Sequence, residues 1–358
     1  MTIATQAAKR PNISLAEDGH EQIVIRQDAE TGLRLIVAVH STVLGPSLGG
    51  MRLKSYAGGL REALDDVMRL SRTMTLKASA AGLDLGGGKA VMIDDGNDQL
   101  RQARLEGAAH VIEGLEGAYV TAEDIGTTCA DMDFMSQFTR FAVGRSVENG
   151  GGGDPSPVTA ETVFQALLRG LLSATGSADL DGRRIGVVGL GKVGSVLAAK
   201  LSAAGAEVLA YDLDQLCAER FLAQHGGRLA GSAEEVMAAP LDVLAPCAAG
   251  GMIDERIARS LDCRVVAGAA NNPIDTRATA RILHERDILF VPDFLANCGG
   301  LIHVSLEWYG EHGPSETELI AGAMDRLDLA IGTAQLEGAP PIEVAERQAL
   351  ERIAAARA

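Results

Sequence analysis

Two lysines and one aspartate in the first half of the chain stand in apolar, glycine-rich surroundings. Lys77 closes the run MTLK, Lys89 follows three glycines, and Asp124 lies in the run TAEDIG. Taken singly, such a lysine is usually a solvated charge and such an aspartate a turn or helix cap. Together they suit acid–base catalysis, because burial lowers a lysine's pKa toward neutrality and a nearby carboxylate can move protons. The run GGGK lacks the other residues of a phosphate-binding P-loop, so that function is not expected.

A second motif, GLGKVG at residues 189–194, has the context of a dinucleotide-binding loop. It follows a predicted strand at 184–188, opens a predicted helix at 193–204, and is followed by a strand at 207–211 that ends before Asp212. The glycines permit close approach of backbone N–H groups to a pyrophosphate, and the carboxylate can accept from ribose hydroxyls. The plain alternative is a tight strand-to-helix turn. Because Asp212 has a second aspartate and no arginine beside it, we expect NAD rather than NADP.

Hydrophobic spacing predicts the elements that carry the first motif. Residues 21–40 contain two β-rich runs around DAETG, which predicts a hairpin. Apolar residues recur at helical steps over 60–74 and 105–115. The glycines at 86–88 break any helix and lead into an apolar run at 90–93, which is typical of a buried strand.

The flexible stretch NGGGGDP at 149–155 divides this segment from a second one. In the second segment short strand patterns alternate with helical stretches, which favours a parallel, doubly wound sheet. These strand patterns lie at 184–188, 207–211, 243–244, 264–267 and 288–291. The stretch from Pro341 has helical spacing and could either extend the second segment or cross back to the first. The predicted fold class is α/β with two domains.

Composition narrows the partners. The 358 residues suffice for about two domains, and 32 Lys and Arg against 48 Asp and Glu give a net charge of −16, which disfavours nucleic acid and membrane surfaces. No apolar run is long enough to span a membrane, and the start, MTIATQAAKRPNISLAEDGHEQ, lacks an apolar signal-peptide core, so we expect a cytoplasmic protein. Five scattered cysteines without a CxxC pair indicate neither a disulfide framework nor a metal site.

Eight motifs together carry a family resemblance. They are LGPSLGG at 44–50, MTLK at 74–77, GGGK at 86–89, TAEDIGTT at 121–128, PSPVTA at 155–160, APCA at 245–248, GAANN at 268–272 and NCGG at 297–300. In the residues and the order of these motifs, the sequence resembles the glutamate/leucine/phenylalanine/valine dehydrogenase superfamily, and within it the leucine and valine dehydrogenases. The resemblance implies reversible, NAD-dependent oxidative deamination of an L-amino acid to its 2-oxo acid and ammonia.

The resemblance also implies a role for each matching residue. Lys89 would be the general base, Asp124 the proton relay, and Lys77 the group that holds the substrate carboxylate. The implied substrate-binding residues are Leu48, Gly49, Gly50, Met74, Lys77, Ala122, Asn272, Leu301 and Val304. The implied cofactor-binding residues are Thr159, Gly189, Gly191, Lys192, Val193, Gly194, Asp212, Cys247, Ala248, Asn271 and Asn297.

The substrate implied in this way is aliphatic, with a branched chain the first expectation. Leu48, Ala122, Leu301 and Val304 are all apolar, and an unpaired carboxylate buried against them would cost several kcal/mol. Glutamate enzymes of the family place a lysine at the position of Leu48. Relatives that accept phenylalanine tend to have a smaller residue at the position of Leu301, where leucine dehydrogenases commonly have valine. Cys298 stands where alanine is usual.

Domain limits and alternatives complete these expectations. The first domain, for substrate, catalysis and oligomerisation, covers 1–147 and is completed by a C-terminal helix at 337–358; a Rossmann NAD-binding domain covers 148–336. A cleft between them would close around the substrate, and the chain is expected to form a homo-oligomer. The alternatives are a phenylalanine dehydrogenase, a non-catalytic sensor of NAD or amino acids, and an NAD-dependent hydroxy-acid dehydrogenase.

Overall fold

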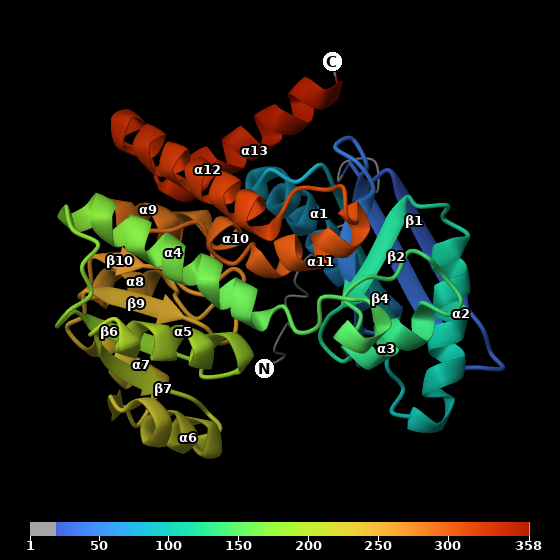
Figure 1. The fold of residues 1–358 in the computed structure, drawn as a ribbon, viewed down its shortest axis with the longest axis horizontal. Helices are drawn as coiled ribbons and strands as arrows, with labels where there is room; N and C mark the ends of the chain where they lie inside the picture. The colour runs from blue at the N-terminus through green and yellow to red at the C-terminus, as the bar shows by residue number, and fades with distance from the viewer. Residues whose placement is uncertain (1–18, 358) are drawn as a thin grey trace, which may run out of the picture.

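The computed structural model describes residues 19–357, which form two α/β lobes joined near residue 150 (Figure 1). Residues 1–18 and Ala358 lie outside this part of the chain. The start of the predicted first domain lies there, with most of the stretch expected to lack a signal peptide. A large hydrophobic core runs through both lobes, and a smaller one fills the space between β2, β4 and α1 in the first lobe. None of the described helices is both long and apolar enough to cross a membrane.

The first lobe is built on a five-stranded sheet in the order β1-β2-β4-β3-β5. Its strands are β1 (Gln22–Gln27), β2 (Arg34–Ser41), β3 (Ser47–Lys54), β4 (Gly86–Ile93) and β5 (Tyr119–Glu123). The predicted hairpin is confirmed, because β1 and β2 pair antiparallel. Strand β3 lies between β4 and β5 and is parallel to both. This order brings the ends of β4 and β5 close together although about thirty residues separate them.

Strand β4 starts at Gly86, four residues before the predicted strand at 90–93. No helix passes through the glycines at 86–88, as expected, because α1 ends at Ala81. The glycines belong to the strand, and glycine is required there because the neighbouring segments leave no room for a side chain. A Cβ on Gly86 would lie 1.8 Å from the carbonyl oxygen of Ser41, and one on Gly87 would lie 2.0 Å from the backbone nitrogen of Thr75. Close packing, and not a turn, requires glycine at these positions.

Three helices accompany this sheet: α1 (Gly59–Ala81), α2 (Arg101–Glu113) and α3 (Cys129–Met135). The helices predicted at 60–74 and 105–115 are confirmed, but α1 continues seven residues past the predicted end. Its last turns are buried all round, since α1 packs on the sheet and on α10, α12 and α13. A helix without an exposed face loses the amphipathic period that marks helices in a sequence. The extension carries Lys77.

The second lobe contains a six-stranded, fully parallel sheet in the order β11-β10-β9-β6-β7-β8. Its strands are β6 (Arg184–Val188), β7 (Glu207–Tyr211), β8 (Arg228–Leu229), β9 (Val243–Pro246), β10 (Val265–Val266) and β11 (Leu289–Phe290). Helix α4 (Ser156–Thr175) precedes these strands. The helices that connect them are α5 (Lys192–Ala203), α6 (Gln215–His225), α7 (Ala233–Ala238), α8 (Glu255–Ser260) and α9 (Arg277–Glu285). The predicted doubly wound sheet is confirmed, and only the two-residue β8 was not predicted.

Four helices complete the chain: α10 (Asp293–Ala296), α11 (Gly299–Tyr309), α12 (Glu316–Glu337) and α13 (Pro341–Arg357). In Figure 1, α11 lies between the lobes, and α12 and α13 lie across the top of both. The Ser79 hydroxyl donates to the Ala349 carbonyl at 2.7 Å, and Arg352 donates to the Leu83 carbonyl at 2.8 Å. The last helix thus packs on α1, while the domain limits given above stay a prediction.

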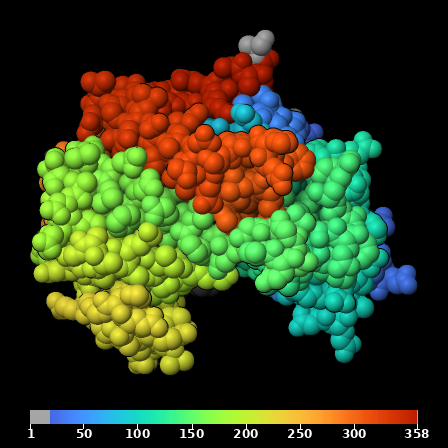
Figure 2. All heavy atoms as spheres, in the orientation of Figure 1, coloured from blue at the N-terminus to red at the C-terminus, as the bar shows by residue number. Residues whose placement is uncertain are grey.

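Helix α11 also binds the segment that joins the lobes. The Glu307 carboxylate accepts from the backbone N–H groups of Gly144 at 2.9 Å and Gly152 at 3.1 Å, and it pairs with Arg145 at 3.2 Å. A glycine-rich stretch that is flexible by composition is therefore fixed to a helix at one end. Below this joint the molecular surface is hollowed between the two lobes (Figure 2).

Candidate active site

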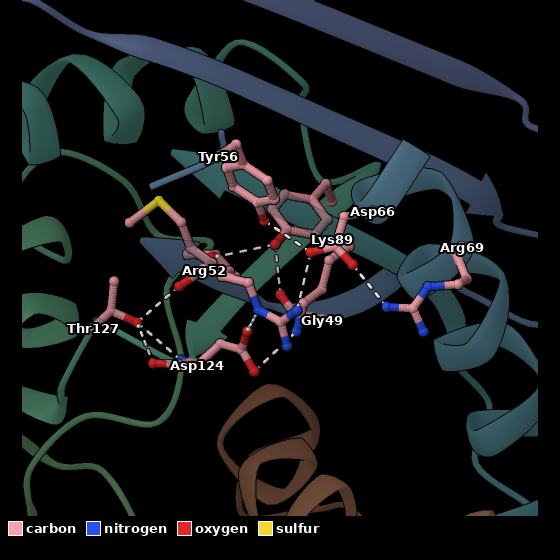
Figure 3. A network of polar contacts seen from close by, with 11 residues as sticks. Gly49, Arg52, Tyr56, Asp66, Arg69, Lys89, Asp124 and Thr127 are labelled. Carbon is pink, nitrogen blue, oxygen red and sulfur yellow. Dashed lines mark hydrogen bonds and ion pairs between the residues drawn. The ribbon is translucent and has the colours of Figure 1, made fainter. Parts of the chain in front are cut away.

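Lys89 and Asp124 meet in the first lobe. Lys89 lies within β4, Asp124 follows β5, and the lysine Nζ is 3.1 Å from the aspartate Oδ1 (Figure 3). Their side chains are 6% and 21% exposed. Thr127 fixes the loop after β5, because its hydroxyl accepts from the Asp124 N–H at 2.9 Å and donates to the Met51 carbonyl at 2.8 Å. The structure therefore brings the predicted base and proton relay into direct contact.

Arg52 of β3, which was not predicted from the sequence, is the third member of this cluster. Its Nε donates to Oδ2 of Asp124 at 2.8 Å, and its Nη1 donates to Asp66 of α1 at 3.0 Å. Asp66 is held in turn by the Tyr56 hydroxyl at 2.8 Å and by Arg69 at 2.7 Å. The only signal in the sequence is a charge between two apolar residues of a strand, which normally marks a solvent-facing position.

Burial and charge act in opposite directions on this pair. Burial lowers the pKa of Lys89 below its ordinary value, and Arg52 adds to this effect while Asp124 opposes it. Burial would raise the pKa of Asp124, but the charges of Lys89 and Arg52 outweigh it and hold that pKa below its usual range. The site thus favours an ionised carboxylate beside a lysine that gives up its proton more easily than a free one.

Lys77 differs from Lys89 in having no counter-ion within the described residues. It is partly buried on α1, and among residues 19–357 no hydrogen bond or ion pair holds its ammonium group. Burial lowers its pKa, against the opposing influence of Cys298 and Asp293 of the second lobe. A cation without a partner at the junction of the lobes is suited to binding an anion.

The backbone at Gly49 and Gly50 is fixed by its neighbours. A Cβ on Gly49 would lie 1.8 Å from the Gly88 carbonyl oxygen, and one on Gly50 would lie 2.8 Å from the Asp124 Cβ. The Tyr119 hydroxyl donates to the Gly49 carbonyl at 2.5 Å. Met74 of α1 lies against Gly49, with its Cγ 3.4 Å from the same Cβ position. Both glycines allow β3 to approach the catalytic cluster closely.

The four apolar residues of the predicted side-chain pocket are almost completely buried. Leu48, Ala122, Leu301 and Val304 are 1%, 5%, 6% and 7% exposed. Leu48 pairs with the residue two before Ala122, so both point to one face of the first sheet. A Cβ on Gly144 would lie 3.6 Å from Val304 and 3.7 Å from Ala122, which places the α11 residue beside the strand residue.

The second motif forms the turn between β6 and α5 in the second lobe. Gly189 has φ +104°, and a Cβ there would lie 2.7 Å from the backbone of Cys247. A Cβ on Gly194 would lie 2.0 Å from the Gly189 carbonyl oxygen, whereas one on Gly191 would point into open space. No side chain caps α5, so its first N–H groups face that space. Val193 is half-buried, and Lys192 is 3.7 Å from Asp154.

Asp212 lies at the end of β7 beside this turn. Its carboxylate accepts from the Leu190 N–H at 2.5 Å and from the Asp214 N–H at 2.7 Å. The residue thus fixes the glycine-rich turn in addition to the ribose contact expected of it. A carboxylate has about four acceptor positions, so two backbone bonds leave it able to accept from hydroxyl groups.

The oxygen of one buried side-chain amide lacks a partner among the described residues. Asn297 is 3% exposed, its Nδ2 donates to the Ala269 carbonyl at 3.1 Å and to Asn271 at 3.0 Å, and its Oδ1 has no partner in the described part of the chain. Thr159 of α4 lies against Gly300, whose Cβ would be 2.9 Å from the threonine hydroxyl. A free amide acceptor such as the Asn297 oxygen fits the N–H group of a carboxamide such as that of nicotinamide.

The remaining predicted residues lie at the rim of this region. Cys247 is half-buried and packs on the glycine-rich turn, and Ala248, Asn271 and Asn272 are exposed. Asn272 has φ +49°, and its N–H donates to the buried Asp293 carboxylate at 2.7 Å. Within residues 19–357, no group of three or more His, Cys, Asp or Glu side chains is arranged to hold a metal ion.

Comparison with known proteins identifies the family. Residues 20–141 match the profile described as Glu/Leu/Phe/Val dehydrogenase, dimerisation domain, and residues 218–357 match Glutamate/Leucine/Phenylalanine/Valine dehydrogenase. The chain is 38% identical to leucine dehydrogenase of Thermoactinomyces intermedius over 93% of its own length and 91% of the relative's. It is 39% identical to valine dehydrogenase of Streptomyces virginiae, over 95% and 96%. The chain belongs to the glutamate/leucine/phenylalanine/valine dehydrogenase family.

Solved structures agree with this assignment. L-tryptophan dehydrogenase from Nostoc punctiforme superposes with a TM-score of 0.82 at 30% identity, covering 96% of this chain and 98% of that one. A hetero-hexameric glutamate dehydrogenase from Thermus thermophilus, in its Leu-bound form, gives a TM-score of 0.76 at 25% identity, covering 94% and 89%. The expected α/β fold and family resemblance are both confirmed.

The protein is an amino-acid dehydrogenase, and its cofactor is NAD. Residues 169–249 match the NAD-binding domain of D-isomer specific 2-hydroxyacid dehydrogenases. That match is confined to the cofactor part of this dehydrogenase, while the flanking segments match the amino-acid enzymes, which argues against a hydroxy-acid dehydrogenase. The uncapped start of α5, the open space at Gly191 and the free Asn297 oxygen fit the pyrophosphate and nicotinamide of NAD.

Proposed function

We propose that this dehydrogenase deaminates an aliphatic, branched-chain L-amino acid reversibly, with Lys89, Asp124 and Lys77 in distinct roles. The observation that carries the proposal is that Lys77 and Lys89 differ in their partners. Lys89 contacts a carboxylate at 3.1 Å, whereas Lys77 has no partner in residues 19–357. One is arranged to exchange a proton and the other to bind an anion.

The chemistry follows from these roles. Lys77, with the backbone at Gly49 and Gly50, binds the substrate carboxylate and so orients the Cα hydrogen toward the second lobe. NAD, when bound, accepts the hydride from Cα, which leaves an iminium ion. Neutral Lys89 takes a proton from a water that attacks the iminium carbon. Asp124 passes the proton from Lys89 to the nitrogen of the resulting carbinolamine. Ammonia then leaves while Lys89, neutral again, takes the hydroxyl proton, which gives the 2-oxo acid.

The apolar lining supports an uncharged aliphatic substrate. Leu48, Leu301 and Val304 offer no counter-ion, so a glutamate side chain would be buried without a partner at a cost of several kcal/mol. The curated relatives named above are leucine and valine dehydrogenases. A single methylene in such a pocket changes specificity by only about 1 to 3 kcal/mol, so we expect several branched-chain amino acids to be accepted with graded efficiency.

An aromatic amino acid is the second candidate, because one structural relative is an L-tryptophan dehydrogenase with a TM-score of 0.82. The bulk of Leu301 and Val304, both buried on α11, supports the aliphatic substrate.

We also propose that the enzyme works as a homo-oligomer in the cytoplasm. The profile matched by residues 20–141 is described as a dimerisation domain. Light scattering of the purified protein tests the assembly, and a monomeric mass would refute it.

The test of the proposed function is a substrate panel. Purified enzyme with NAD and single L-amino acids should form NADH fastest with leucine, valine or isoleucine, and the reverse reaction should require ammonia. Lys89→Ala should lower turnover by about 10²- to 10⁴-fold and still bind NADH, because the dinucleotide fold lies in the other lobe. Preference for glutamate or an aromatic amino acid would overturn the substrate assignment, and an active Lys89→Ala enzyme would overturn the mechanism.

A further inference from the structure

A row of alternating charges leads from the surface of α1 to the catalytic pair. Arg69 contacts Asp66 at 2.7 Å, Asp66 contacts Arg52 at 3.0 Å, and Arg52 contacts Asp124 at 2.8 Å. Asp124 then contacts Lys89 at 3.1 Å (Figure 3). The Arg52 and Asp66 side chains are 13% and 14% exposed. Two buried charges placed behind a catalytic carboxylate call for an explanation, because burying them is costly.

We propose that Arg52 is a positioning residue for deamination: it holds Oδ2 of Asp124, so that Oδ1 faces Lys89 and the substrate nitrogen in one fixed orientation. The inference rests on the proposed function, because it assigns Asp124 the proton relay. Arg52 is assigned no contact with the substrate, and it acts through its bond to Asp124 and its charge beside Lys89.

The geometry explains why the residue is arginine. Its Nε binds Asp124 while its Nη1 binds Asp66, so one rigid planar group spans two carboxylates. Asp66 keeps that plane fixed, since the Tyr56 hydroxyl donates to the same oxygen that Arg52 binds. A lysine at position 52 would supply the charge without the two-sided fork.

Arg52 also sets the charge balance of the pair. It favours the ionised form of Asp124 and the neutral form of Lys89. The other ionisable groups that interact with the pair are Asp66 and Lys77 of α1, Tyr119 of β5 and Tyr56. Asp66 raises the pKa of Lys89, opposite to Arg52. The two neighbours should therefore shift the pH dependence of the reaction in opposite directions.

A purely structural role for Arg52, joining β3 to α1, makes different predictions. Loss of that ion pair would lower stability but leave the pH profile of the folded enzyme in place. Arg183 provides the matched control, since it pairs with Asp242 at 2.9 Å in the second lobe, with side chains 28% and 22% exposed. Arg183→Gln removes the same charge and a comparable ion pair away from the catalytic cluster.

The experiment measures kcat and kcat/KM against pH for the best amino acid of the panel, with NADH binding and thermal unfolding as further readouts. In Arg52→Gln we expect kcat to fall about 10- to 100-fold and the rise of kcat/KM with pH to move up by about 1 pH unit. Asp66→Asn should move that rise to lower pH. Arg52→Lys should keep the wild-type midpoint but recover only part of kcat. Arg183→Gln should keep both.

An Arg52→Gln profile with the wild-type midpoint and kcat, in a protein that binds NADH normally, would overturn the proposal. Full recovery of kcat in Arg52→Lys would overturn the positioning argument. An equal loss of kcat in Arg183→Gln would show that Arg52 contributes only to stability. A wild-type enzyme that fails to deaminate any amino acid of the panel would refute the proposed function instead. The wild-type panel and the Arg52 series therefore separate the two failures.

Discussion

Replacing Asp124 with asparagine keeps the shape of the side chain and removes its charge. Lys89 at 3.1 Å and Arg52 at 2.8 Å are then left as two cations without the carboxylate between them. At an effective dielectric constant of about 20, each lost attraction is worth about 5 kcal/mol before relaxation. Breaking a buried ion pair by removing one partner typically costs about 3 to 5 kcal/mol. We expect a loss near the lower end, because Asp124 is 21% exposed and Lys89 can release its proton.

The proton release gives the stability loss a pH dependence. Without Asp124, burial and Arg52 depress the pKa of Lys89 further, while the unfolded chain keeps that proton up to about pH 10. The unfolded state then binds more protons than the folded state, so stability rises with pH in this window. Denaturant unfolding of Asp124→Asn should show a deficit that shrinks as the pH is raised toward 10.

The same substitution should affect turnover and its pH profile separately. Loss of the proton relay lowers kcat by about 10²- to 10⁴-fold. Loss of the group that raises the pKa of Lys89 moves the rise of kcat/KM to lower pH. Asp242→Asn is the control, since Asp242 pairs with Arg183 at similar exposure, 22%; it should lose stability and keep kcat. An Asp124→Asn enzyme with the parent's turnover and pH profile would refute the assignment.

Three further outcomes are expected. Leu301→Ala should raise the kcat/KM ratio of phenylalanine to leucine by about 10-fold; an unchanged ratio would place Leu301 outside the pocket. Asp212→Ala should weaken the binding of NAD and narrow its advantage over NADP in steady-state kinetics, because the carboxylate no longer repels a 2′-phosphate. Unchanged kinetic constants for both cofactors would show that Asp212 serves only to fix the glycine-rich turn. Burial lowers the pKa of His40 from 6.5 to about 4, so the folded protein resists a proton that the unfolded chain accepts, and stability should fall from pH 6.5 toward 4. In His40→Asn, denaturant unfolding should show a smaller fall in stability between pH 6.5 and 4. An equal fall would show that His40 is not its cause.

Local sequence determined much of this protein. Periodicity predicted the hairpin, the βαβ unit around GLGKVG and the parallel sheet, because these features depend on residues near one another in the chain. Residue chemistry singled out Lys89 and Asp124, since charged groups in apolar, glycine-rich runs are unusual. It singled out Lys77 as well, although the predicted helix at 60–74 ended three residues before Lys77.

Only the tertiary structure decided which of these groups touch. The order β4-β3-β5 places Lys89 beside Asp124, and no local pattern specifies that order. Arg52 gave no signal, because its partner Asp66 lies on a helix and its partner Asp124 follows another strand. The glycines at 86–88 were expected to break a helix ahead of the strand, and they are themselves strand residues packed against β2, α1 and Tyr119. Such features depend on contacts between distant segments, and their energies arise only once the chain has packed.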